Sequence, residues 1–247
     1  MKSTILSLAV FATILTSLIT KSQTATEDFD PLGEINDLPK LIRVQAEFIE
    51  MPHATYTKLM ANPRRNANDT DLRAECAKLV STGDAGILET MSVIALPGQN
   101  ASSKSVAEYI YPTEYEPGQI PETVERNVSK SLASPPLPTA FDVRNTGSTF
   151  EVEALIDHTE KFVELRFAPN LVYHIENINW GADKVDGAAG PVEMPRFYSL
   201  SVKTGATLMS GQPAMIAALS PKNDKGITDS TRKIMLFLRA DVLTIGK

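Results

Sequence analysis

The stretch that decides the fold class is Pro195–Thr244, which reads PRFYSLSVKTGATLMSGQPAMIAALSPKNDKGITDSTRKIMLFLRADVLT. It predicts, in order, a strand at Arg196–Lys203, a turn at Gly205, a strand at Ala206–Leu219, a polar loop at Ser220–Arg232 and a closing strand at Lys233–Leu243. Ala214–Leu219 and Ile234–Leu238 are apolar at every position, which is typical of strands buried on both faces. The stretch therefore predicts a sheet segment that needs strand partners elsewhere in the chain.

A hairpin at Phe150–Phe167 is the expected partner. Apolar residues alternate with Glu151 and Glu153 in its first strand, and with Glu164 and Arg166 in its second. A short polar link at residues 157–161 joins the two strands, as a hairpin requires. One apolar and one charged face predict an antiparallel sheet that is solvated on one side.

The first half of the chain adds strands and two short helices. The predicted elements are a strand at Leu41–Glu50, a helix at Thr55–Met60, an amphipathic helix at Asp69–Val80 capped by Asp69 or Thr70, and strands at Ile87–Leu96 and Val106–Tyr111. Cys76 is expected to be a small buried hydrophobe on the second helix. The predicted fold class is α+β and β-rich: antiparallel sheets and hairpins with one or two short packing helices.

Two stretches are expected to be loops. Pro112–Pro138 is a proline-rich insertion, with a short helix expected at Thr123–Leu132. Asn177–Pro195 contains three glycines and the single tryptophan. Between the two, Ala140–Arg144 leads to an expected turn at Gly147.

The N-terminus has the order of a secretory signal peptide. Lys2 precedes an uncharged apolar run at Ile5–Ile19, and small or polar residues follow it. The alternative is an uncleaved membrane anchor, but the run of about 15 residues is shorter than the roughly 20 that a spanning helix needs. The expected organisation is a signal peptide at residues 1–25, a linker at 26–40 and one β-rich domain at 41–247.

Composition restricts the function classes. The 247 residues carry a formal charge of −6, with 43% hydrophobic and 22% charged residues. These proportions are ordinary for a globular protein. An acidic chain without a dense Lys/Arg run lacks the basic footprint of a nucleic-acid-binding protein, so no nucleic-acid partner is expected.

Catalytic and metal-binding patterns are weak. His53, His158 and His174 lie far apart in the sequence and match no zinc spacing. Glu151 and Glu153 share one strand face at about 7 Å, a separation that acid–base chemistry can use, although a solvated strand face is far commoner. We therefore expect no catalytic, cofactor-binding or metal-binding residues; an exported hydrolase using these two carboxylates is the alternative.

Four segments occur in a telling order: Val44–Glu50, Leu72–Val93, Gly147–Ile156 with Phe162–Phe167, and Tyr198–Leu219 with Lys233–Leu243. Together they resemble the C-terminal domain of secretins, the outer-membrane pore proteins of bacterial type II and type III secretion systems. The resemblance covers roughly residues 41–245, and the order and spacing of the segments carry it. It implies a β-rich domain that oligomerises in a ring, each subunit lending strands to one shared barrel.

The leading hypothesis is thus a non-enzymatic, exported secretin-like protein in the periplasm or at the outer membrane. The resemblance implies self-association through β-strands and partners among other secretion-system proteins. The alternative is a soluble periplasmic scaffold or binding protein that keeps the fold without forming a channel. The loop at Ser220–Thr231 favours this alternative, because it is polar and charged where secretins carry a membrane-inserting segment.

Overall fold

The computed structural model describes residues 39–61, 68–119, 134–180 and 192–245. In these ranges the elements are β1 (Lys40–Pro52), α2 (His53–Met60), α3 (Thr70–Thr82), β2 (Gly86–Ala95), β3 (Asn100–Glu116), β4 (Leu137–Ile156), β5 (Phe162–Asn179), β6 (Glu193–Ser201), β7 (Thr204–Met209), β8 (Pro213–Leu219) and β9 (Arg232–Thr244). Every strand pair is antiparallel. The predicted β-rich α+β class is confirmed. The expected signal peptide lies outside the described residues, as does the expected linker up to residue 38.

The first sheet has the strand order β2-β1-β9-β8. Strand β9 pairs with β1 along its whole length, from Lys40↔Thr244 to Pro52↔Arg232. Its run Ile234–Leu238 is buried at every position, as expected of an interior strand. The same expectation for Ala214–Leu219 is wrong, because β8 forms the edge of the sheet and only Ala214 is buried in it.

The second sheet has the order β3-β4-β5-β6, with β7 paired to β5. The predicted hairpin is confirmed as β4–β5, with Ile156 opposite Val163 at the turn and Phe150 opposite Pro169. The closing strand does not pair with this hairpin, contrary to expectation. Strand β9 pairs with β1 and β8, and the hairpin packs against it face to face.

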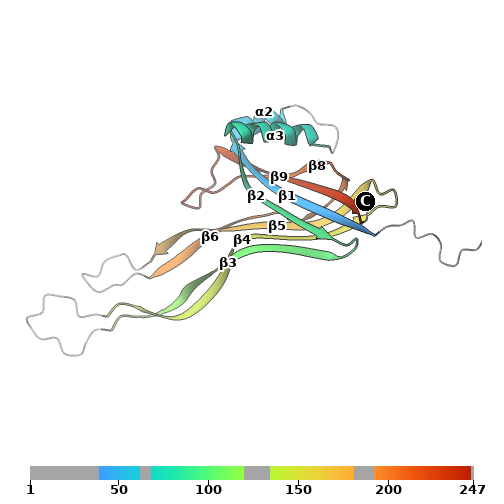
Figure 1. The fold of residues 1–247 in the computed structure, drawn as a ribbon. Helices are drawn as coiled ribbons and strands as arrows, with labels where there is room; N and C mark the ends of the chain where they lie inside the picture. Colours follow the sequence, from blue (N-terminus) through green and yellow to red (C-terminus); the bar gives the residue numbers. More distant parts are fainter. Residues whose placement is uncertain (1–38, 62–67, 120–133, 181–191, 246–247) are drawn as a thin grey trace, which may run out of the picture. The chain divides into compact units, whose positions relative to one another are not determined.

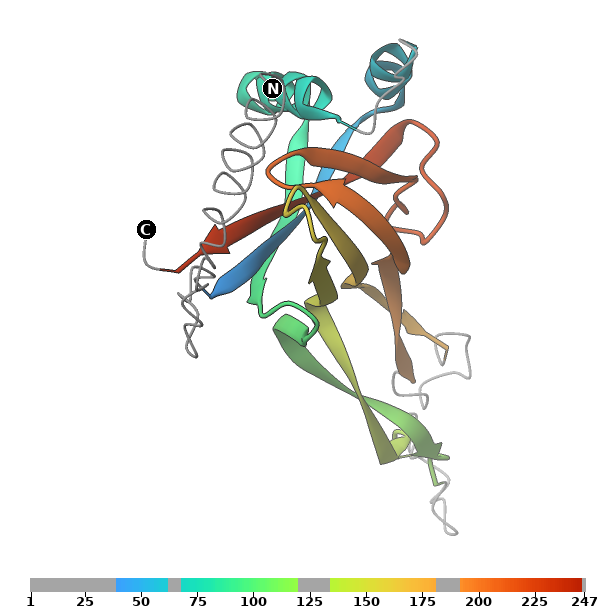
Figure 2. The same ribbon diagram turned by 90° about the vertical axis from the view of Figure 1, so that its right-hand side faces the viewer.

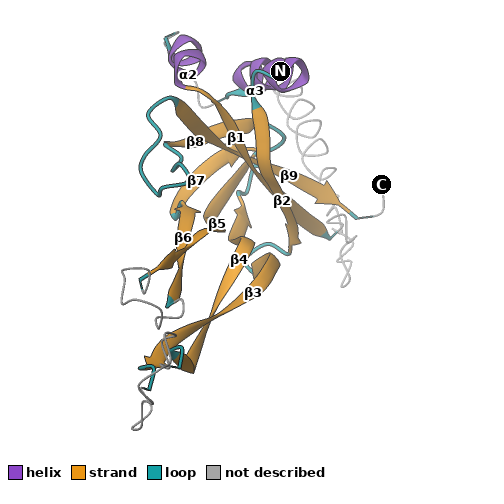
Figure 3. Cartoon of the chain, turned by 90° about the vertical axis from the view of Figure 1, so that its left-hand side faces the viewer, coloured by secondary structure: helices purple, strands orange, loops and turns teal. Residues whose placement is uncertain are grey.

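The two sheets and the helices form three layers (Figures 1 and 3). Between the sheets lies the main core, whose largest fully buried side chains include Phe48, Phe150, Leu236 and Leu238. The helices cover the other face of the first sheet over a smaller cluster: Ile49, Met51, Leu72, Cys76, Met235 and Phe237. Cys76 is buried in this cluster, as the sequence predicted.

Both predicted helices are present, but the cap of the second one differs. Asp69 occupies the N-cap position without a side-chain hydrogen bond to its own helix. Its Oδ2 instead accepts a hydrogen bond from the Met215 backbone N–H on β8, at 2.8 Å. The Thr70 N–H donates to Asn68 Oδ1 at 3.0 Å, so Asn68 supplies the local turn that starts the helix.

The predicted single strand at Ala206–Leu219 is in fact two strands in different sheets. A turn at Ser210–Gln212 separates β7 from β8, and Gly211 takes a positive φ of 82° there. The expected turn at Gly205 is also wrong: Gly205 lies inside β7, opposite Arg166 of β5, and β6 and β7 both pair with β5. A turn that moves the chain from one sheet to the other therefore replaces the expected continuous strand.

The expected proline-rich loop is partly strand. Strand β3 continues to Glu116 and β4 begins at Leu137, with a register shift next to Pro112. A shifted register accommodates a proline, which cannot donate a ladder hydrogen bond. The second expected loop is also shorter, because β5 reaches Asn179 and β6 begins at Glu193. The helix expected at Thr123–Leu132 lies wholly outside the described residues.

The expected turn at Gly147 is wrong. Strand β4 runs straight through this residue, which faces Val106 of β3 and takes a φ of 119°. A Cβ atom placed there would lie 2.2 Å from the Ser105 carbonyl oxygen, so only glycine permits this close strand approach. Gly147 marks the point at which β4 leaves β5. In Figure 2 the paired β3 and β4, coloured green to yellow-green, continue away from the rest of the sheet.

Candidate assembly surface

Two β-ribbons extend from the second sheet beyond Gly147. Pairing between β4 and β5 ends at Gly147↔Val172, whereas β3–β4 pairing continues to Glu116↔Leu137 and β5–β6 pairing to Asn179↔Glu193. We call the outer parts of these pairs the β3–β4 ribbon and the β5–β6 ribbon. Among the described residues, the segments Leu137–Thr146 of β4 and Tyr173–Asn179 of β5 each pair on one side only. Unpaired strand edges can accept strands of another chain.

One face of the β3–β4 ribbon is apolar and exposed. Ile110 lies opposite Val143, and Pro112 lies opposite Phe141, so these side chains form a stripe across the two strands. Ile110 is 64% exposed, Phe141 60% and Val143 50%. Isolated exposed apolar residues are ordinary, but a contiguous stripe indicates a contact surface.

The opposite face of this ribbon packs against the β5–β6 ribbon through aromatic side chains. Tyr109 stacks on His174 with ring centroids 4.5 Å apart, and its ring also meets Phe197 edge-on at 5.7 Å. The Arg144 guanidinium lies 4.9 Å from the centre of the Phe197 ring. These four side chains connect the two ribbons, which in the described residues have no backbone pairing with each other beyond Gly147↔Val172.

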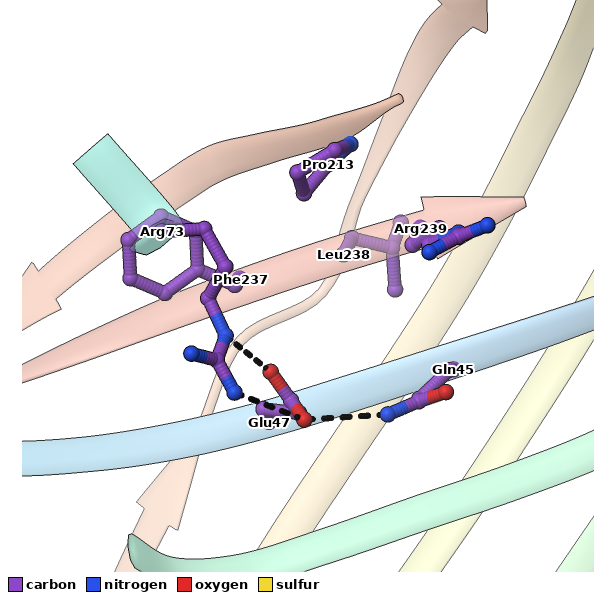
Figure 4. Close-up of a pocket in the computed structure, with 7 residues that line it drawn as sticks. All are labelled: Gln45, Glu47, Arg73, Pro213, Phe237, Leu238 and Arg239. Atoms are coloured by element: carbon purple, nitrogen blue, oxygen red, sulfur yellow. Dashed lines mark hydrogen bonds and ion pairs between the residues drawn. The ribbon is translucent and has the colours of Figure 1, made fainter. Parts of the chain in front are cut away.

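A partly buried ion pair joins α3 to β1 (Figure 4). Arg73 donates to Glu47 from Nε at 2.6 Å and from Nη2 at 3.2 Å, and Gln45 Nε2 donates to Glu47 Oε1 at 2.9 Å. The hydrogen bond to Glu47 raises the pKa of Arg73, against a smaller opposing effect of burial. The adjoining cavity of about 180 Å³ is completed by Pro213, Phe237, Leu238 and Arg239.

The charges around this cavity are internally compensated. Arg239 donates to Asp241 at 2.8 and 2.9 Å, and the Arg43 guanidinium lies 3.6 Å from the same carboxylate. Within the described ranges, no group of three or more His, Cys, Asp or Glu side chains has the arrangement of a metal site. The cavity therefore resembles a structural junction between α3 and the sheet.

The carboxylates singled out in the sequence, Glu151 and Glu153, point to the outer face of β4. Val152 and Ala154, which alternate with the two glutamates along the strand, point into the main core, as the sequence pattern predicted. Arg166, directly across on β5, lies 3.8 Å from Glu153 and is 83% exposed. The two carboxylates thus lie on a solvated sheet face, which is the commoner arrangement for such a pair of glutamates on a strand.

The structure does not bring the three histidines together. His53 begins α2 and its Nδ1 lies 2.8 Å from the Ser230 carbonyl oxygen. His158 lies in the β4–β5 turn, 2.7 Å from Asp157. Only His174 joins the ribbon contacts, which sequence reasoning missed. The alternation of Tyr109 and Tyr111 with neighbouring residues was the available signal for that inward face.

The loop at Ser220–Thr231 is folded onto the sheets. Arg196 of β6 donates from Nη1 to Glu176 and to the Lys225 carbonyl oxygen, each at 2.8 Å. Asn223 Oδ1 accepts from the backbone N–H groups of Lys225 and Ile227 at 3.0 and 2.9 Å. The loop is therefore held both by its own turn and by the β5–β6 ribbon.

Beneath this loop lies a cavity of about 290 Å³ with Tyr173 and Tyr198 in its wall. The two rings stack with centroids 5.9 Å apart. Burial raises the pKa of Tyr198 to about 12, against a smaller lowering by the backbone of Lys222. Its buried hydroxyl makes no hydrogen bond of normal geometry within the described part of the chain, so the Lys222 backbone has only the smaller effect on its pKa.

In the described ranges, no helix has both the length and the apolar character needed to cross a membrane.

Solved structures similar to this chain include secretins. ExeD of Aeromonas hydrophila is 13% identical, and the match covers 83% of this chain and 49% of that chain with a TM-score of 0.42. The secretin of the ETEC pilotin–secretin AspS–GspD complex is 12% identical, and the match covers 84% of this chain and 50% of that chain with a TM-score of 0.45. The V. cholerae type IV competence pilus secretin PilQ is 10% identical, and the match covers 96% of this chain and 65% of that chain with a TM-score of 0.42.

The chain thus spans about half the length of the first two of these structures, with 49% and 50% of each covered. No protein-family model matches the chain, and no curated protein matches it. Solved secretins are among the structures that the chain is similar to, as its sequence segments predicted.

Proposed function

We propose that this chain is a non-enzymatic, exported secretin-like protein that works by self-association through β-strands. The observation that carries the proposal is the pair of ribbons with unpaired edges and an exposed apolar stripe at Ile110, Phe141 and Val143. A single copy leaves these groups in water, whereas a second copy satisfies the backbone edges and buries the stripe. The four sequence segments that resemble secretins support the same interpretation.

In its full form the proposal is a ring of copies at the outer membrane that contributes to a pore, with other secretion-system proteins as partners. One chain of 247 residues cannot enclose a wide pore, so this form requires an oligomer. The exported location rests on the predicted signal peptide at residues 1–25.

The test is to extract the full-length protein in detergent, measure its mass by light scattering and image it by negative stain. We expect large, ring-shaped assemblies. The double variant Ile110→Asp, Val143→Asp places charges on the stripe and should shift the mass toward the monomer. The control is Ile227→Asp, because Ile227 is similarly exposed at 61% but lies on the Ser220–Thr231 loop. A wild-type protein that is strictly monomeric in detergent would refute self-association.

The second candidate is a soluble periplasmic scaffold that keeps the fold without forming a channel. The observation that favours it is the Ser220–Thr231 loop, whose contacts with Arg196 and internal turn at Asn223 hold polar groups against the sheets. Cell fractionation distinguishes the two candidates. Recovery of all the protein in the soluble periplasmic fraction supports the scaffold, and recovery with the outer membrane supports the pore component.

A further inference from the structure

Strand β8 is an edge strand without a charged side chain. Its seven residues read PAMIAAL, and among the described residues it pairs with β9 alone, from Pro213↔Arg239 to Leu219↔Ile234. An uncharged apolar strand with a free backbone edge readily adds strands of other chains, so native proteins protect such edges. Strand β2, at the opposite edge of the same sheet, carries Glu89 within its run. Any charged protection of β8 therefore has to come from another element.

Asp69, the residue before α3, occupies the start of this edge. Its backbone N–H donates to the Pro213 carbonyl oxygen at 3.0 Å, and its Oδ2 accepts a hydrogen bond from the Met215 N–H at 2.8 Å. Pro213 and Met215 are two residues apart, so their backbone groups point to the same side of β8, away from β9. A residue of an incoming strand would use its own N–H and carbonyl oxygen for these two bonds. Asp69 thus takes the place of one strand residue, with its carboxylate in the position of the carbonyl oxygen.

Two further features protect the same part of the edge. Pro213 has no N–H, so it offers an incoming strand no donor at the first position of β8. The register of β8 against β9 shifts between Met215 and Ala217, and such an irregularity disturbs the even spacing that an added strand needs. The proline, the Asp69 contact and the register shift follow one another along the strand.

The Asp69 carboxylate does not cap its own helix. It makes no side-chain hydrogen bond to the first turn of α3, and the Thr70 N–H is held by Asn68 Oδ1 instead. An aspartate at this position ordinarily accepts from the second or third N–H of its helix. Here the carboxylate is directed to the strand, and its removal leaves the bond that starts the helix in place.

We propose that Asp69 is an edge cap, which competes with an extended strand of a second copy for the free edge of β8. An incoming strand has to displace both Asp69 bonds before it pairs with Pro213 and Met215, so the cap weakens strand addition there. The inference rests on the proposed self-association through β-strands and identifies an edge at which that association is opposed.

The test compares the association of the wild type with that of three single variants, by sedimentation velocity of the full chain in detergent over a range of concentrations. Asp69→Ala removes the carboxylate and frees the Met215 N–H. Asp69→Asn keeps a side-chain oxygen that accepts the same bond. Asp71→Ala is the matched control, because Asp71 is an exposed acidic residue in the first turn of the same helix.

We expect Asp69→Ala to be half assembled at a concentration about tenfold lower than the wild type, a change that corresponds to about one net hydrogen bond. Asp69→Asn and Asp71→Ala should stay close to the wild type. Equal association of Asp69→Ala and the wild type overturns the cap. So does an Asp71→Ala protein that gains as much as Asp69→Ala, since loss of any acidic charge on α3 would then be the cause.

Hydrogen exchange of the Met215 amide separates an edge cap from a contact that only attaches α3 to the sheet. In dilute Asp69→Ala the amide should exchange faster than in the wild type. At assembling concentrations it should regain protection, because a strand of another copy then accepts its hydrogen bond. Fast exchange at every concentration leaves Asp69 with an anchoring role and overturns the proposal.

The edge cap and the proposed self-association fail in different ways. A wild type that stays monomeric while Asp69→Ala assembles supports the cap and contradicts self-association of the natural chain. Equal assembly of both proteins supports self-association and overturns the cap. If neither protein assembles, both proposals are overturned.

Discussion

The Arg73 guanidinium on α3 donates two hydrogen bonds to the Glu47 carboxylate on β1, at 2.6 and 3.2 Å, and both side chains are largely shielded from water. Removal of one partner leaves a partly buried charge. We expect Arg73→Met to lower the free energy of unfolding by about 2 kcal/mol, measured by urea denaturation. The matched control is Arg166→Met, which breaks an exposed ion pair at 3.8 Å and should cost less than about 1 kcal/mol. Equal costs in the two variants would contradict a structural role for the enclosed pair.

The close approach of Gly147 to Ser105 predicts an unusually sensitive glycine. A Cβ there would lie 2.2 Å from a backbone oxygen, so Gly147→Ala must push β3 and β4 apart. We expect a loss of about 3 kcal/mol in thermal or urea unfolding. Gly83→Ala is the control, because Gly83 has a φ of 82° but no atom within 4 Å of the added Cβ, and it should cost about 1 kcal/mol. A Gly147 variant no less stable than the Gly83 variant would argue against the close strand approach.

The unpartnered hydroxyl of Tyr198 predicts a stability loss in alkali. Burial raises the pKa of Tyr198 to about 12, so between the ordinary tyrosine pKa of about 10 and pH 12 the folded chain keeps a proton that the unfolded chain has lost. The free energy of unfolding therefore falls as pH rises through this window and is unaffected by Tyr198 below it. Tyr198→Phe should reduce that fall and match or exceed wild-type stability at neutral pH. Urea unfolding at pH 8, 10 and 11 measures both effects, and an unchanged pH dependence in the variant would show that Tyr198 is not the responsible group.

Burial of Cys76 predicts a thiol that reacts only on unfolding. It lies with Leu72 on the buried side of α3, packed with Ile49 and Met235 of the first sheet and fully shielded from solvent. A thiol reagent should label the native protein far more slowly than the urea-unfolded protein, and the native rate should rise in Leu72→Ala, which removes a neighbouring core side chain. Rapid labelling of the native wild type would place Cys76 at the surface and contradict the packing of α3.

The carboxylates Glu151 and Glu153 are expected to contribute little to stability. Both point to solvent, and only Glu153 has an ion-pair distance, to an exposed arginine. Replacing both with glutamine should change the free energy of unfolding by less than about 1 kcal/mol. The same variant tests the hydrolase alternative, which requires an activity of the wild type that the double substitution abolishes.

Local periodicity predicted much of the fold. Alternation of apolar and charged residues located the β4–β5 hairpin with its correct faces, and helical spacing located α2 and α3. Continuous apolarity at Ile234–Leu238 identified an interior strand.

The choice of strand partners was decided only in three dimensions. The sequence gives each strand a face but not a neighbour, because antiparallel pairing joins residues as distant as Lys40 and Thr244. For the same reason, Ala214–Leu219 has the composition of an interior strand but forms an edge. A turn at Gly211, which the chain uses to change sheets, leaves a sequence signal no different from that of a simple hairpin.

The sequence by itself therefore determined the β4–β5 hairpin with its buried and solvated faces, the two helices, the interior strand at Ile234–Leu238 and the resemblance to secretins. Tertiary structure decided that β4 separates from β5 at Gly147, that two ribbons extend beyond it, and that Asn177 links them. The physical reason is that side-chain periodicity reports burial along one strand, whereas sheet edges and the contacts between ribbons depend on strands that are remote in the chain.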